Sequence, residues 1–193
     1  IDACTAAMSH PYANGATGDL LWRPEALLRV LVAADRARLR LALHAIGDRA
    51  SDVALDTLEQ MIATNPPWDR RPRLEHVEIV SDHTPARMAR LGITASVQPV
   101  HADPAIQPSW RAQLGDERVH RGYPWTAFTD AGARPAFGTD APTAPHEALV
   151  NLYIATTRRS PTNASLPANE PQYAVAAPAA LRHATFDSAA SFN

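Results

Sequence analysis

A short apolar run that ends at a histidine and passes directly into a helix is the feature that most constrains the fold. The sequence Leu-Arg-Leu-Ala-Leu before His44 is typical of a buried parallel strand. Gly47 permits a tight turn, and Asp48 is a suitable N-cap for a helix that begins at Arg49. A histidine is therefore expected where a buried strand ends, which is where α/β barrels place their chemistry.

The same arrangement returns at three later strands. His76 lies in the second apolar run, Gln98 ends the third run before a proline, and Asp140 ends the fourth. His44 and His76 are separated by about one βαβ unit, which takes roughly 30 residues. Four strands are thus predicted, each with a polar side chain near one end.

Segments with helical spacing or helix boundary signals alternate with these strands, and no hairpin signal separates any pair of strands. Such alternation predicts an α/β fold with a parallel sheet. Four strands with their helices make half of a (β/α)8 barrel, which usually needs about 250 residues. The helices are expected at residues 24–34, 48–64, 84–91, 124–130, 146–157 and 177–190.

Composition narrows the functional classes. The chain has 193 residues, of which 46% are hydrophobic and 20% charged, as in an ordinary globular domain. A net charge of −2 predicts no nucleic-acid partner, and the sequence has no apolar run of the roughly 20 residues that span a membrane. The single cysteine, Cys4, excludes an internal disulfide and is compatible with the cytoplasm, which is the expected location.

Two histidines and an aspartate at strand ends indicate a metal site. Neutral imidazole nitrogens and carboxylate oxygens are the usual ligands of Zn²⁺ at catalytic sites that keep one position open for water. His44, His76 and Asp140 could supply them, and Asp140 could also accept a proton from metal-bound water. Each residue taken alone is more often structural, so the prediction depends on their joint placement.

Four motifs in order resemble the YtcJ-like branch of the amidohydrolase superfamily. The resemblance runs through nearly the whole chain. The motifs are His44–Ala50, Leu74–Val77, Ala95–Pro99 with His101, and Phe137–Pro142.

The resemblance implies the second half of a (β/α)8 barrel and hydrolysis of a non-peptide C–N bond, as in an amide or an N-substituted formamide. It implies one or two divalent ions, with zinc as the expected metal and a small molecule as the substrate. His44 and His76 would bind metal, Asp140 would be both ligand and proton shuttle, and Gln98 and His101 would contact substrate.

Two features of the family are missing. The chain has no His-x-His pair and no lysine, which the family places on the first and fourth strands. Residues 1–193 are therefore interpreted as a partial barrel domain, without the N-terminal half-barrel and the small β domain of the family. Such a fragment is expected to have little activity alone and to associate through its open sheet edges.

Two alternatives remain open from the sequence. One is a non-catalytic barrel remnant or interaction module that binds no metal, and the other is a related deaminase. Three aromatic residues in the long connection after Gln98 could line a pocket, although packing is the favoured interpretation; they are Trp110, Tyr123 and Trp125. Glu75 is interpreted as structural because it should face away from His76.

Overall fold

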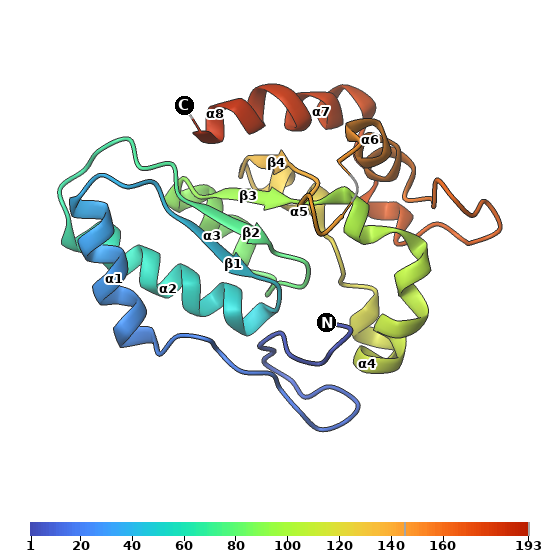
Figure 1. The fold of residues 1–193 in the computed structure, drawn as a ribbon, viewed down its shortest axis with the longest axis horizontal. Coiled ribbons are helices and arrows are strands. Elements are labelled where there is room, and N and C mark those ends of the chain that lie inside the picture. The colour runs from blue at the N-terminus through green and yellow to red at the C-terminus, as the bar shows by residue number, and fades with distance from the viewer. Residues whose placement is uncertain (145, 193) are drawn as a thin grey trace.

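The structure is a computed structural model that describes residues 1–144 and 146–192. Its centre is a parallel sheet whose four strands lie side by side in sequence order, β1-β2-β3-β4 (Figure 1). The predicted α/β fold with four parallel strands is therefore confirmed. The strands are β1 (Ala42–Ala45), β2 (Arg73–His76), β3 (Thr94–Val97) and β4 (Pro135–Phe137).

Helices follow the strands as the sequence predicts, with one addition. The α-helices are α1 (Pro24–Arg36), α2 (Asp48–Thr64), α3 (Thr84–Leu91), α4 (Gln107–Val119), α5 (Trp125–Asp130), α6 (Ala148–Thr157), α7 (Ala177–Arg182) and α8 (Ser188–Phe192). The shorter helical turns are η1 (Pro99–Ala102), η2 (Pro104–Ile106), η3 (Pro171–Tyr173) and the π-helical η4 (His183–Asp187). Helix α4 was not predicted, and α6 begins two residues later than expected.

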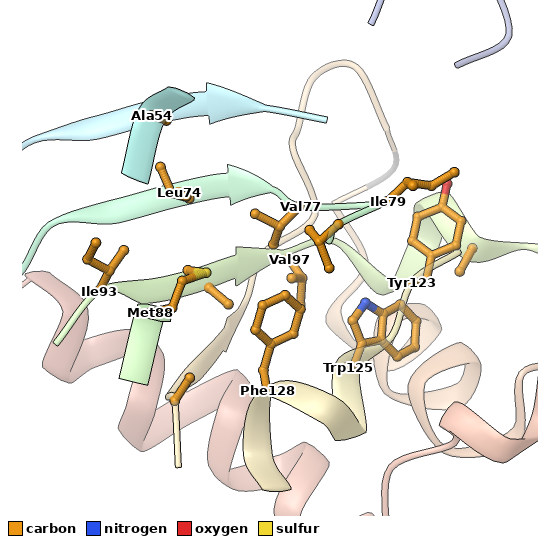
Figure 2. Packing of buried hydrophobic residues seen from close by; sticks show 14 of the residues in the cluster. Ala54, Leu74, Val77, Ile79, Met88, Ile93, Val97, Tyr123, Trp125 and Phe128 are labelled. Atoms are coloured by element: carbon orange, nitrogen blue, oxygen red, sulfur yellow. The ribbon is translucent and has the colours of Figure 1, made fainter. Parts of the chain in front are cut away.

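Helices α2, α3 and α5 pack against the sheet, with α2 and α3 on one face of it (Figure 1). In the core, Met88 from α3 and Phe128 from α5 point toward Val97 of β3 (Figure 2). Trp110, Tyr123 and Trp125 belong to the same buried cluster. Their predicted packing role is therefore confirmed.

Strand β1 is less buried than predicted, because it is the edge of the sheet. Leu41 and Leu43 are half-buried, and His44 is exposed. An apolar groove of about 490 Å³ follows this edge, and Leu21 and Trp22 also line it. The expectation of a fully buried strand was wrong, since no fifth strand covers β1 in the described part of the chain.

Helix α2 has the expected bounds of residues 48–64, but its N-cap is not the predicted Asp48. Gly47 occupies the N-cap position, and Asp48 is the first helical residue. The Asp48 carboxylate accepts hydrogen bonds from the backbone N–H groups of Ser9 and Arg49, both at 2.8 Å. Asp48 therefore ties the N-terminal segment to the helix start.

The C-terminal helices contact β4 and the residues at the beginning of β2. Helix α8 and η4 contact β4. Arg71 donates to the carbonyl of Ala190 at 2.9 Å, and the Arg73 guanidinium lies 4.1 Å from the centre of the Phe192 ring. Within residues 1–144 and 146–192, no helix combines the length and the apolar character that a membrane crossing needs.

Candidate metal centre

The strand register aligns the ends that carry the predicted site residues. Ala45 of β1 lies beside His76 of β2, and Val97 of β3 lies beside Phe137 of β4. Because all four strands are parallel, the segments that follow them leave the sheet on one side, at the carboxyl ends of the strands. The polar residues that end or follow the four strands therefore lie on the same side of the sheet.

Three histidine rings meet there. The centres of the His44 and His76 rings are 4.5 Å apart, with the planes at 67°. The His101 ring stacks on His76 at 5.7 Å and 13°. His76 thus lies between His44, from the neighbouring strand, and His101, from η1.

His101 also lies between two carboxylates. Its Nδ1 is 3.3 Å from Glu78 Oε1, and its Nε2 is 3.8 Å from Asp140 Oδ2. Glu78 was not among the predicted site residues. The period-2 alternation of a strand does not identify it, because β2 ends at His76 and the backbone at His76 and Val77 is left-handed.

Asp140 occupies a turn after β4. Its φ of 61° lies in the left-handed region, and 38% of its side chain is exposed. The Thr143 hydroxyl donates to Asp140 Oδ2 at 2.7 Å. Asp140 is thus held near the histidines while its carboxylate stays open to solvent.

Gln98 is buried at the end of β3. Its Nε2 donates to the Ser96 carbonyl at 3.4 Å, while its Oε1 has no hydrogen-bond partner among the described residues. An unpaired buried amide oxygen is costly unless a further donor is present. Gln98 therefore retains one unused hydrogen-bond acceptor.

Although His44 is exposed as a whole residue, partial desolvation of its ring lowers its pKa, and the charge of the neighbouring His76 lowers it further. The imidazole is accordingly neutral at pH 7, as a metal ligand must be. Burial, followed by the charge of Glu78, raises the pKa of Tyr123 well above its usual value. Tyr123 therefore remains a neutral phenol beside the site.

A divalent ion fits the donor atoms at the carboxyl ends of the strands. His76 is only 8% exposed, and its Nδ1 has no hydrogen-bond partner in the described chain. Ligand atoms of His76, Glu78 and His101 all lie within 4.8 Å of one another. Glu75 is outside this group: it lies beside His44 in the strand register and forms an ion pair with Arg73 at 3.1 Å.

Comparison with known proteins assigns the family. The amidohydrolase family model matches residues 1–193. The chain belongs to the amidohydrolase family. The resemblance inferred from the strand-end motifs is thereby confirmed.

Three proteins of known name are similar in sequence to this amidohydrolase chain. It is 39% identical over 140 residues to the Arabidopsis thaliana protein LONG AFTER FAR-RED 3, covering 72% of this chain and 24% of the relative. It is 30% identical over 159 residues to YtcJ of Bacillus subtilis (strain 168), which carries an amidohydrolase name. This match covers 81% of this chain and 29% of the relative. It is 31% identical over 163 residues to the N-substituted formamide deformylase of Arthrobacter pascens. This match covers 82% of this chain and 28% of the relative.

A solved structure confirms the half-barrel. The amidohydrolase chain superposes with a TM-score of 0.83 and 30% identity on an uncharacterized metal-dependent hydrolase from Pyrococcus horikoshii OT3. The match covers 98% of this chain and 37% of that structure. The chain thus spans less than a third of the sequence relatives described above and little more than a third of the solved hydrolase.

Proposed function

We propose that this chain supplies part of the active site of a zinc-dependent hydrolase that cleaves a non-peptide C–N bond. The observation that carries the proposal is the contact of the His76 ring with both His44 and His101 at the carboxyl ends of the strands. His101 in turn lies 3.3 Å from the Glu78 carboxylate and 3.8 Å from that of Asp140. The Arthrobacter pascens relative, named for removing formyl groups from N-substituted formamides, suggests the substrate class.

The proposed ligands are His44, His76 and Asp140. A bound divalent ion would lower the pKa of a coordinated water to about 7 and polarise the substrate carbonyl. His44 suits this role because partial desolvation of its ring and the charge of His76 keep its imidazole neutral. Asp140 suits it because its exposed carboxylate lies within 3.8 Å of His101.

Asp140 would also move the proton. Its carboxylate would take a proton from the attacking water and return it to the leaving nitrogen. The Thr143 hydroxyl, 2.7 Å from Oδ2, would hold the carboxylate in place during both transfers. The unpaired Oε1 of Gln98 and the His101 ring would orient the amide or formamide group.

The test uses a chimera in which this sequence replaces the matching region of the Bacillus subtilis relative. N-alkyl and N-aryl formamides, amides and amino-substituted ring compounds are offered, and release of amine, formate and ammonia is measured. We expect amine release, and a loss of about 100-fold or more in kcat for Asp140→Asn, which is the usual contribution of general acid–base catalysis. The 193-residue chain alone is expected to show little turnover.

Two results would contradict the proposal. Equal rates for the chimera and its Asp140→Asn variant would exclude Asp140 as the proton carrier. Ammonia from aminated rings, with no turnover of amides, would indicate a deaminase. Metal content and circular dichroism of both proteins establish that they are folded and loaded.

A further inference from the structure

Glu78 and His101 place ligand atoms beside His76 that the predicted set of His44, His76 and Asp140 does not use. His76 ends β2, Glu78 follows it by two residues, and His101 comes from η1 after the neighbouring strand. The three residues have ligand atoms within 4.8 Å of one another. Two imidazoles and one carboxylate form a ligand set used at catalytic zinc sites.

The observed spacing suits a metal ion. Zn–N and Zn–O bonds of about 2.0 to 2.1 Å in a tetrahedron separate neighbouring ligand atoms by about 3.3 Å. Nδ1 of His101 and Oε1 of Glu78 are 3.3 Å apart. One pair of ligands is therefore already at coordination spacing.

The burial of the group also favours a cation. Glu78 is 7% exposed and His76 is 8% exposed, so a carboxylate and an imidazole are both withdrawn from water. Nδ1 of His76 has no hydrogen-bond partner among the described residues. A divalent ion bound within this group would neutralise the buried carboxylate.

The backbone between the two ligands is held in an unusual conformation. The φ angles of His76 and Val77 are 76° and 42°, in the left-handed region that a β-branched residue rarely adopts. Hydrogen bonds fix the segment: Val77 N–H donates to Ala45 O at 2.9 Å, and Tyr123 N–H donates to Glu78 O at 2.7 Å. Strain maintained in this way is characteristic of functional sites.

We propose that His76, Glu78 and His101 form a second divalent-cation site. It lies beside the predicted trio, which is the metal site of His44, His76 and Asp140, and shares His76 with it. This site uses two residues that the proposed function assigns to no metal. It requires neither His44, which lies on the neighbouring strand, nor Asp140, which lies in the turn after β4.

The test is calorimetric titration of Zn²⁺ into the complete 193-residue chain after removal of metal by a chelator. Glu78→Gln and His101→Asn are expected to weaken zinc binding by at least about 100-fold, since loss of an outer-shell partner alone costs 10- to 100-fold. His44→Ala and Asp140→Asn are expected to keep zinc bound at the second site, with an affinity within about threefold of that site in the wild-type chain. Circular dichroism shows whether each variant is folded.

Matched controls come from exposed residues of the same types. Glu25 and His10 are exposed, and Glu25→Gln and His10→Asn should leave zinc binding unchanged. They report any zinc held by surface carboxylates or imidazoles in general. A loss in either control equal to that of Glu78→Gln would overturn the proposal.

The remaining outcomes separate this proposal from the proposed function. Zinc binding that is lost in His44→Ala and Asp140→Asn but retained in Glu78→Gln would overturn the second site and favour the predicted trio. Loss in all four variants would indicate one shared site and would also overturn it. A folded chain that binds no zinc would overturn it too, while amine release by the chimera would still decide the proposed function.

Discussion

At the scale of single residues, Asp35 is the buried carboxylate that joins the end of α1 to the connection between α2 and β2. Its Oδ1 accepts hydrogen bonds from Trp68 Nε1 and Arg70 Nε, both at 2.8 Å, and its Oδ2 accepts one from Asn65 at 2.8 Å. Burial would raise the pKa of Asp35, but the hydrogen bonds from Arg70, Asn65 and Trp68 together lower it below its ordinary value.

Replacing Asp35 by Asn should lower the free energy of unfolding by about 3 kcal/mol at pH 7, because it leaves the Arg70 charge without its partner. The lowered pKa means that the stabilisation is complete above the unfolded pKa of about 3.9 and is lost as pH falls through the folded pKa. The difference between wild type and variant should therefore shrink below about pH 4. Urea unfolding at a series of pH values measures it.

Asp69→Asn is the matched control, because Asp69 is an exposed carboxylate paired with Arg71 at 2.7 Å. It should change stability little at any pH. A pH-independent difference for Asp35→Asn would show that its charge contributes nothing and that only its shape matters.

The residues of the site were only partly accessible from the sequence. The positions of His44, His76, Gln98 and Asp140 at or just after the strand ends could be predicted, because each follows an apolar run. Glu78 could not be placed, since its position beside His101 depends on the left-handed backbone at His76 and Val77, which no periodic pattern reveals.

At the scale of elements, the turn from β1 to α2 depends on close contact with the N-terminal segment. A Cβ added at Gly47 would lie 2.2 Å from the carbonyl oxygen of Ala7 and 2.9 Å from its carbon. Because both are backbone atoms, Gly47→Ala must displace either the segment or the helix start. We expect a loss of about 2 kcal/mol in the free energy of unfolding.

The control is Gly138→Ala, the same chemical change at the end of β4. A Cβ there would meet no atom within 4 Å, so its effect should stay within about 0.5 kcal/mol. Chemical denaturation of both variants gives the comparison. Similar losses would show that the contact between Gly47 and Ala7 is not what makes Gly47 necessary.

The elements themselves were predicted well where a single period governs a segment. The strands and the helices α1, α2 and α3 have clear apolar spacing and boundary residues. Helix α4 was missed because Pro108 lies near its start and Gly115, with φ of 80° and ψ of 172°, interrupts it. Its position is fixed by the burial of Trp110 and Leu114, which is a tertiary effect.

At the scale of the whole molecule, the open edge at β1 leaves apolar surface in water. Leu21 is 95% exposed and Trp22 is 50% exposed beside the apolar groove. We expect the chain to associate as its concentration rises, and the double substitution Leu21→Asp and Trp22→Asp to reduce this association. Sedimentation velocity over a range of concentrations tests both expectations.

Leu181→Asp serves as the control, because Leu181 is 55% exposed in α7, and it does not line the groove. It should leave association unchanged. A chain that remains monomeric at every concentration would contradict the expectation, and so would an equal effect of Leu181→Asp. The half-barrel itself was predictable from alternating strands and helices, but the exposure of its edge required coordinates.

The order of the strands has a consequence for biosynthesis. Each strand pairs with the one made just before it, so the sheet can grow in a single direction while the chain leaves the ribosome. The contacts of Ala190 with Arg71 and of Phe192 with Arg73 join residues made after all four strands to residues made much earlier. These contacts can therefore form only after the four strands of the sheet have been made.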